Sequence, residues 1–267
     1  MNYTFGLIGC GNMGSAVARA VSQVTHNGIL ANRTPQRAQK LAEQLSFSWG
    51  SNTETAEKSR FLFLGVKPHL MSDVLQELQP VLAARETKPI LVSMAAGLTI
   101  SQLEEMAGGT CPVIRIMPNT PVSVGQGVIL YDYGNGVQPE DETAFLELLA
   151  QSGRLVHLSE SFIDAGTAIS GCGPAFTYLL IDAMADGGVA CGLPRADALQ
   201  LAAQTLLGSA QMVMETGKHP EQLKNEVCSP GGSTIQGVRT LEQRSVRAAM
   251  MDAVIAAYEK SAALGKG

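Results

Sequence analysis

The chain has 267 residues, of which 45% are hydrophobic, so it can bury a large core and can hold one large domain or two of ordinary size. Its formal net charge is −5, and its 19 lysines and arginines are scattered along the chain. This balance argues against a protein that binds nucleic acid or an anionic membrane surface.

The first part of the chain alternates short apolar runs with amphipathic stretches. The apolar runs are rich in β-branched and aromatic residues, and helical patterns separate them, which is typical of βαβ units. The order predicts an α/β fold with a mostly parallel, doubly wound sheet. We expect strands at residues 3–8, 29–31, 61–66, 90–94, 113–117, 128–131 and 155–158.

Near residue 160 the pattern changes. Alanine, leucine, methionine and glutamine then dominate long helical stretches, which are interrupted by short segments of glycine and proline. We therefore expect an all-helical second part, with one domain at residues 1–160 and another at 161–267. No flexible linker separates them in the sequence, so a helix around residues 162–170 is expected to join the domains.

A glycine motif follows the first expected strand: Gly9-Cys10-Gly11-Asn12-Met13-Gly14. Glycines at this spacing allow a tight turn and a close approach of the backbone to a diphosphate, and the first N–H groups of the next helix face that anion. The motif predicts a dinucleotide cofactor held by Gly9, Gly11, Asn12, Met13 and Gly14. The alternative interpretation is an ordinary glycine-rich turn between a strand and a helix.

The position that selects between NAD and NADP lies about 20 residues beyond such a motif. Here the chain has Asn32-Arg33-Thr34 in place of an acidic residue. A guanidinium can pair with the 2′-phosphate of NADP, and a hydroxyl can add a donor. We predict that Asn32, Arg33 and Thr34 bind NADPH, with NADH as an alternative cofactor, unless Arg33 is only a surface residue.

Two further strand ends are expected to border the cofactor, because ligands of open α/β sheets lie beyond the carboxyl ends of the strands. They carry Val66-Lys67-Pro68 and Ala95-Ala96-Gly97, where small residues would admit a nicotinamide ring. Asn119 follows the next strand in a proline-rich turn and is a further candidate contact. Lys67 has an equally simple interpretation as a solvated lysine.

The helical part contains Ser229-Pro230-Gly231-Gly232-Ser233-Thr234 before another helical run. Ser233 or Thr234 can open that helix, whose free N–H groups could hold a small carboxylate without an arginine. Gly231, Gly232, Ser233 and Thr234 are therefore the candidate substrate-binding residues. A plain capped turn between helices remains the alternative.

The compartment is inferred from the cysteines and the N-terminus. The five cysteines are far apart and form no Cys-x-x-Cys pair, which favours free thiols and no metal site. No export signal pattern is present, and no uninterrupted apolar run approaches the ~20 residues that cross a bilayer. We expect a cytoplasmic protein.

Several of these segments together resemble the pyrroline-5-carboxylate reductases. They occur in the family's order and span nearly the whole chain. The departures are small: Cys172 and Phe176 stand where the family usually has serine and tyrosine. The matching segments are Gly9–Gly14, Asn32–Thr34, Val66–Pro68, Met117–Pro121, Asp182–Gly188 and Ser229–Thr234.

The resemblance implies a Rossmann-like domain followed by a helical dimerisation domain, in a homodimer that assembles into a larger ring such as a decamer. It implies NAD(P)H-dependent reduction of the cyclic imine 1-pyrroline-5-carboxylate to L-proline, the last step of proline biosynthesis. The loop Gly231–Thr234 would hold the substrate carboxylate, and the Thr234 hydroxyl would lie near the imine nitrogen. Met250 and Met251 in the last helix fit burial against a partner subunit, though also a plain core.

Thr234 is thus the expected catalytic residue, although a neutral threonine is a poor proton donor. We expect it to hydrogen-bond the nitrogen, while the proton comes from solvent or the substrate arrives as the iminium. The hydride carbon and the imine carbon must meet at about 3–3.5 Å. We expect none of His26, His69, His157 and His219 to be the essential acid.

Two other functions remain open. A β-hydroxyacid dehydrogenase has a similar domain order but needs a base, commonly a helical lysine. A non-catalytic NADP-binding sensor would bind NADPH without turnover. The lysines of the second part lie near helix ends or the chain end, which counts against the dehydrogenase: Lys218, Lys224, Lys260 and Lys266.

Overall fold

The computed structural model describes residues 2–264, and within them the chain forms two compact units. The sheet unit contains residues 2–171 and 257–264, and the helical unit contains residues 172–256. The expected domain boundary after residue 160 falls at the start of the helix Glu160–Ser170. The division into domains at residues 1–160 and 161–267 stays a prediction. Lys266 and the outermost residues of the expected domains lie outside the described residues.

The sheet unit is built on one mixed sheet in the order β3-β2-β1-β4-β5-β6-β7-β8. All neighbours pair in parallel, apart from the antiparallel pair β6 and β7. All seven expected strands are present, and the fold is the expected Rossmann-like one. The strands are β1 (Tyr3–Ile8), β2 (Gly28–Ala31), β3 (Ser48–Trp49), β4 (Ser59–Leu64), β5 (Ile90–Ser93), β6 (Val113–Pro118), β7 (Gly127–Tyr133) and β8 (Gly153–His157).

The observed ends of the seven expected strands lie within two residues of the predicted ones, and two differences concern β3 and β4. The short edge strand β3 was not expected, because two exposed residues give no alternating pattern. The strand expected at 61–66 begins at Ser59 and ends at Leu64, so Gly65 and Val66 already belong to the turn over the sheet edge. That shift places both residues where a ligand of an α/β sheet lies.

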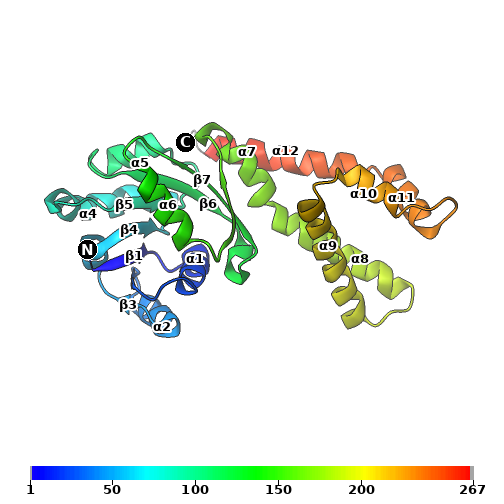
Figure 1. Ribbon diagram of the computed structural model, residues 1–267, viewed down its shortest axis with the longest axis horizontal. Coiled ribbons are helices and arrows are strands. Elements are labelled where there is room, and N and C mark those ends of the chain that lie inside the picture. Colours follow the sequence, from blue (N-terminus) through cyan, green and yellow to red (C-terminus); the bar gives the residue numbers. More distant parts are fainter. Residues whose placement is uncertain (1, 265–267) are drawn as a thin grey trace. The chain divides into compact units, whose positions relative to one another are not determined.

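Helices cover both faces of the sheet (Figure 1). One apolar cluster joins α1, α2 and α6 to the face carrying Phe5 and Phe63, and another joins α3, α4 and α5 to the face carrying Leu62 and Leu64. Because alternate strand residues point to opposite faces, each helix set packs on its own row of side chains. These helices are α1 (Asn12–Ser22), α2 (Pro35–Leu45), α3 (Asn52–Lys58), α4 (Met71–Ala84), α5 (Ile100–Met106) and α6 (Pro139–Leu148).

Helix α7 (Glu160–Ser170) is the helix expected near residues 162–170. Its Ile163 is fully buried in a small apolar cluster with Met117 of β6 and Leu130 of β7. The helix is therefore fixed on the antiparallel end of the sheet.

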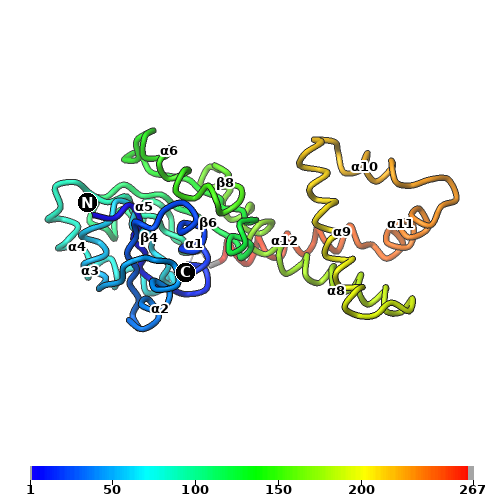
Figure 2. The backbone as a smooth tube through the Cα atoms, turned by 60° about the horizontal axis from the view of Figure 1, so that its bottom comes forward, coloured from blue at the N-terminus to red at the C-terminus, as the bar shows by residue number. Residues whose placement is uncertain are grey.

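From residue 160 to 264 the structure contains helices and turns without a strand, as expected. In the helical unit, α8 and α9 pack side by side, which both views show (Figures 1 and 2). Buried hydrophobic residues of this unit, within 172–256, are confined to Ala185, Ala198 and Ala202. The helices are α8 (Gly173–Ala190), α9 (Arg195–Thr216), α10 (Pro220–Glu226), α11 (Ser233–Gln243) and α12 (Val246–Leu264), the last of which has residues in both units.

Candidate functional site

Glycines bring the carboxyl ends of β1 and β4 close together. At this pair the strand order reverses, because β2 and β3 lie on one side of β1, and β4 and the later strands lie on the other side. Gly9 has a φ of +105°, and a Cβ built on it would lie 2.7 Å from the Gly65 carbonyl. A Cβ on Gly14 would lie 2.2 Å from the Gly9 carbonyl oxygen. Only glycines allow this approach of β1, β4 and α1, which places the turn at the topological switch point of the sheet.

Gly11 opens the space above this turn. It is the N-cap of α1, which begins at Asn12, has no side-chain cap and has no acidic residue in its first turn. A Cβ on Gly11 would meet nothing within 4 Å. The first-turn N–H groups therefore face open space that can take an anionic diphosphate.

Asn32 ties the glycine turn to the turn after β2. Its Oδ1 accepts a hydrogen bond from Cys10 N at 3.0 Å, and its Nδ2 donates to the Thr34 carbonyl at 3.0 Å. A carboxylate at this position could accept from Cys10 N but could not donate to Thr34. The Asn32 amide therefore holds the two turns of the site together, a role additional to the expected contact with the cofactor.

A cavity of about 470 Å³ lies over the carboxyl ends of β1, β2 and β4. Three cationic side chains border it, Arg33, Lys67 and Arg37, together with the acidic Asp73 and Glu77. The expected cofactor residues that it brings together are Gly9, Gly11, Asn32, Arg33, Thr34, Val66 and Lys67.

Sequence reasoning missed Arg37. It lines both this cavity and a second one of about 450 Å³ that also contains Asn12 and Arg19. Arg37 lies in the first turn of α2, and its backbone N–H donates to the Thr34 carbonyl at 3.0 Å. Its position three residues after the N-cap Thr34 was the available signal, because the first turn of α2 faces the same sheet edge.

The other expected cofactor residues do not line the larger cavity: Asn12, which lines the second cavity, and Met13, Gly14, Pro68, Ala95, Ala96, Gly97 and Asn119. Gly14 instead packs under the glycine turn, and Pro68 opens a short 3₁₀ helix at residues 68–70. Ala95 N donates to Ser93 Oγ at 3.3 Å, and Gly97 has a φ of +80°. The turn after β5 is thus tightly built from small residues but lies beside the cavity rather than in its wall.

The Asn119 side chain is buried and is engaged within the chain at both ends. Its Oδ1 accepts from Val128 N at 2.9 Å, and its Nδ2 donates to the Ser170 carbonyl at 2.9 Å. These bonds join the end of β6 to β7 and to the end of α7. In this structure the Asn119 amide therefore connects three elements of the sheet unit through hydrogen bonds.

The Cys10 thiol belongs to the glycine turn but is not a candidate nucleophile. Burial raises the pKa of Cys10 to about 11, so the thiol is neutral near pH 7. Its Sγ contacts the Ala31 carbonyl at 3.5 Å. The residue therefore packs between β1 and β2.

In the helical unit, α11 begins at Ser233, in agreement with the expectation that Ser233 or Thr234 opens this helix. The N-cap before it is Gly232, with φ −73° and ψ 168°. Gly232 N donates to the Ser229 carbonyl at 3.0 Å, and Gly231 has a φ of +72°. The extended glycine therefore ends the turn immediately before the helix.

This start leaves the hydroxyls of Ser233 and Thr234 exposed. The first turn of α11 has no side-chain cap and no acidic residue. Its N–H groups are therefore free to hydrogen-bond an anion, and a ligand there would lie close to two hydroxyl groups.

Three of the four histidines and two lysines of the helical unit form local contacts. His26 Nδ1 lies 3.1 Å from the Leu45 carbonyl, His219 accepts from Glu221 N at 3.2 Å, and His157 Nε2 lies 3.1 Å from Asp132. Lys218 and Lys224 pair with glutamates of α10. Within residues 2–264, no three of the His, Cys, Asp and Glu side chains gather in a group that could hold a metal ion.

Comparison with known proteins identifies the family. Residues 160–264 match the family model for pyrroline-5-carboxylate reductase dimerisation, and residues 4–97 match the model for coenzyme F420-dependent NADP oxidoreductase. The pyrroline-5-carboxylate reductase of Escherichia coli is 39% identical over the full length of both chains, and that of Glycine max is 42% identical over 97% of this chain and 95% of its own. The chain belongs to the pyrroline-5-carboxylate reductase family.

Solved structures of the family agree over the whole chain. The Plasmodium falciparum pyrroline carboxylate reductase with NADP bound has a TM-score of 0.87 and 34% identity, covering 99% of this chain and 98% of that one. The Coxiella burnetii pyrroline-5-carboxylate reductase has a TM-score of 0.90 and 29% identity, covering 100% of both chains. The family resemblance expected from the sequence segments is confirmed.

One helical run bears on the expectation about membrane spans. Within the described residues, the run Glu160–Ala190 is long and apolar enough to cross a bilayer by length and composition. The sequence expectation concerned an uninterrupted apolar run, and this run contains polar residues such as Asp164 and Ser170, so it does not contradict that expectation. The run lies inside the part that matches the pyrroline-5-carboxylate reductase dimerisation model.

Proposed function

We propose that the chain catalyses the NADPH-dependent reduction of 1-pyrroline-5-carboxylate to L-proline, the last step of proline biosynthesis. The observation that carries the proposal is full-length identity of 39% to the Escherichia coli enzyme of that name. The glycine-built switch point of the sheet supports it, because it supplies a dinucleotide site. NADPH, when bound, supplies the hydride that adds to the imine carbon, while the ring nitrogen takes a proton.

The sheet unit would hold the cofactor. The first turn of α1 would bind the diphosphate, and Arg33, Thr34 and Arg37, which line the same cavity, would bind the 2′-phosphate. No carboxylate stands at the end of β2, where one would repel that phosphate. NADPH is therefore the expected cofactor and NADH the weaker alternative.

The turn Gly231–Thr234 would hold the substrate. The free N–H groups of α11 bind the ring carboxylate, and the Thr234 hydroxyl hydrogen-bonds the ring nitrogen. Thr234 orients the ring and does not supply the proton, which comes from solvent or is already present in the iminium form. The catalytic contribution of the chain is then orientation in a dry site more than acid–base chemistry.

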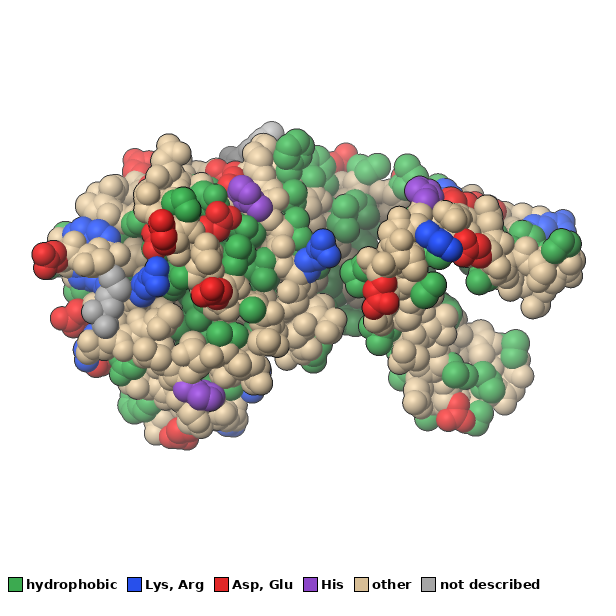
Figure 3. Space-filling view, in the orientation of Figure 1, with side chains coloured by type: hydrophobic (Ala, Val, Ile, Leu, Met, Phe, Trp, Pro, Cys, Tyr) green, Lys and Arg blue, Asp and Glu red, His purple; other side chains and the backbone are tan. Residues whose placement is uncertain are grey.

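The helical unit would form a homodimer, which assembles into a larger ring such as a decamer. Large hydrophobic side chains are exposed along α8 and α9, including Tyr178, Leu179, Leu201 and Leu207 (Figure 3). Exposed apolar surface of this extent is a mark of protein–protein contact. The proposal includes a small-molecule substrate and neither a nucleic acid nor a membrane as partner. It also includes a cytoplasmic location and a domain boundary between residues 160 and 161.

Absorbance at 340 nm tests the function directly. NADPH oxidation is measured with pyrroline-5-carboxylate, a six-membered cyclic imine and a β-keto acid. Turnover with the five-membered imine supports the proposal. Turnover with the β-keto acid alone would instead indicate a dehydrogenase, and NADPH binding without any turnover would indicate a sensor.

A further inference from the structure

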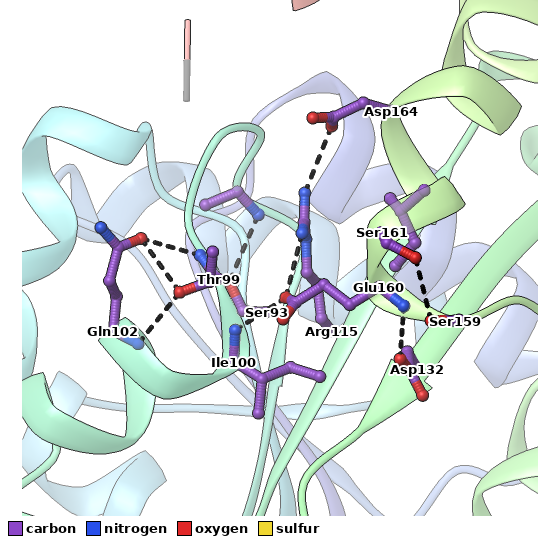
Figure 4. A network of polar contacts seen from close by, with 12 residues as sticks. Ser93, Thr99, Ile100, Gln102, Arg115, Asp132, Ser159, Glu160, Ser161 and Asp164 are labelled. Atoms are coloured by element: carbon purple, nitrogen blue, oxygen red, sulfur yellow. Dashed lines mark hydrogen bonds and ion pairs between the residues drawn. The ribbon is translucent and has the colours of Figure 1, made fainter. Parts of the chain in front are cut away.

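The turn between β5 and α5, residues 94–99, is anchored at both ends by polar side chains (Figure 4). At its start, Ala95 N donates to Ser93 Oγ at 3.3 Å. At its end, the N–H of Ile100 donates to Glu160 Oε1 at 2.8 Å. The second anchor comes from the first residue of α7, sixty positions further along the chain.

The contact from Glu160 is additional to the normal cap of α5. Thr99 and Gln102 already form a capping box, in which Gln102 N donates to Thr99 Oγ1 at 3.2 Å and Thr99 N donates to the Gln102 side chain at 2.9 Å. That box leaves the N–H of Ile100 without a partner on α5. Glu160 accepts from that group, so it fixes the end of the turn to another element.

Glu160 is itself held in place by a buried cation. Arg115 of β6 has only 4% of its side chain exposed, and its Nη1 lies 3.0 Å from the same Glu160 Oε1. Its Nη2 reaches Asp164 at 3.5 Å, and the backbone N–H of Glu160 donates to Asp132 Oδ2 at 2.6 Å. Figure 4 shows Glu160 lying between Arg115 and Ile100. A carboxylate that pairs with a buried cation and accepts from a backbone N–H, in a residue whose own N–H is bonded to Asp132, has little freedom to move.

The centre of the turn consists of small residues whose side chains form few contacts, so its position depends on the anchors at its two ends. Ala96 is exposed, and Gly97 adopts a left-handed φ of +80° without a side chain. Ala95 is buried, and its methyl group is small. The height of Ala96 and Gly97 above the sheet is therefore set mainly at the two ends of the turn.

We propose that Glu160 is a positioning residue for hydride transfer: held by Arg115, it fixes the turn Ala95–Gly97, which would border the nicotinamide. The inference rests on the proposed function and adds to it a residue that touches neither cofactor nor substrate. A displacement of one ångström at a reacting centre is enough to slow a reaction about 100-fold, so a residue acting through the turn has room for a large effect. Binding of the adenosine and diphosphate parts of NADPH depends on the other end of the site and should change little.

The test compares three full-length variants. Glu160→Ala removes the anchor of Ile100, and Asp164→Ala is the matched control because it removes a carboxylate from Arg115 without touching Ile100. Glu160→Gln keeps an oxygen that can accept from Ile100. We expect Glu160→Ala to lower kcat roughly tenfold, while Asp164→Ala stays within about twofold and Glu160→Gln recovers most of the loss.

Two readouts separate positioning from loss of structure. The dissociation constant for NADPH, measured by fluorescence, should stay within about threefold in all variants. Hydrogen exchange at residues 95–100 should accelerate in Glu160→Ala and not in Asp164→Ala. If Glu160→Ala does not fold, Glu160→Asp serves instead, because it keeps the charge for Arg115 but is too short to reach Ile100 as well.

Equal kcat in Glu160→Ala and the wild type, or equal losses in Glu160→Ala and Asp164→Ala, would overturn the inference. The first result would show that the anchor is irrelevant to the reaction, and the second that the network only holds α7. A wild-type protein that fails to reduce pyrroline-5-carboxylate would count against the proposed function alone. In that case, unchanged exchange at residues 95–100 in Glu160→Ala would still overturn the anchoring itself.

Discussion

The sheet unit and the helical unit differ in how they bury hydrophobic side chains. The sheet unit has a fully buried aromatic and aliphatic interior that includes Phe5, Phe61, Phe63 and Phe145. In the helical unit, the buried hydrophobic residues within 172–256 are three alanines, whereas Leu179 is 68% exposed and Met214 67% exposed. The sheet unit carries a core of its own, and the helical unit has apolar surface suited to another chain. Their stabilities should therefore depend differently on protein concentration.

The largest effect is expected for Phe63→Ala in the sheet unit. Removing a fully buried ring leaves a cavity between β4 and its neighbours and should lower the free energy of unfolding by about 3–5 kcal/mol. Urea denaturation followed by circular dichroism measures the change, which should be the same at all protein concentrations. A loss that disappears at high concentration would show that the sheet unit also depends on a partner.

Leu179→Arg tests the other side of the comparison. A charge on the exposed face of α8 should dissociate the proposed homodimer, because a lone buried charge in an interface is strongly unfavourable. Analytical ultracentrifugation should show a shift towards monomer, with NADPH binding retained. Val24→Arg, an exposed apolar residue of the sheet unit, is the control and should leave the oligomer intact. Unchanged sedimentation of the Leu179 variant would place the interface elsewhere.

Arg33→Asp tests the cofactor part of the sheet unit. Loss of a charge-assisted contact and addition of a repulsive charge should raise the KM for NADPH about 10- to 100-fold, with a small change for NADH. Steady-state kinetics with both cofactors give the ratio. Arg154→Asp makes the same change of charge at an exposed site on β8 and should leave the ratio unchanged. Equal effects on NADPH and NADH would remove Arg33 from 2′-phosphate recognition.

The smallest effect is expected in the helical unit, at Thr234. Thr234→Ala should lower kcat/KM for pyrroline-5-carboxylate about tenfold, the value of one hydrogen bond of roughly 1.4 kcal/mol. Thr234→Ser should keep most of the activity. Thr240→Ala removes another exposed hydroxyl from α11 and serves as the control. Full activity in Thr234→Ala would exclude the proposed contact with the ring nitrogen.

Much of the sheet unit was predictable because its signals are local. The strand before Gly9, the glycine spacing and the helix after it lie within one stretch of the chain, and periodicity marks each element. The antiparallel β7 was also within reach, since residues 119–126 are too few for the crossover that parallel neighbours need. The sequence prediction of a mostly parallel sheet did not use that length.

What could not be predicted depends on contacts between distant parts of the chain. The hydrogen bond of Asn32 to Cys10 spans 22 positions, and that of Glu160 to Ile100 spans 60. No sequence pattern around Asn32 or Glu160 indicates which distant residue it contacts. The N-cap of α11 could not be named from the sequence for a different reason: glycine, serine and threonine all serve as N-caps, and only the backbone angles select among them.

The double use of the Asn32 amide limits how the coenzyme preference can be redesigned. The obvious exchange towards NADH would place aspartate at the end of β2, where it could still accept from Cys10 N but would lose the N–H that supports Thr34. Substitutions at Arg33 and Arg37 leave that bridge intact. A variant library for altered coenzyme use should therefore hold residue 32 fixed and vary its two arginine neighbours.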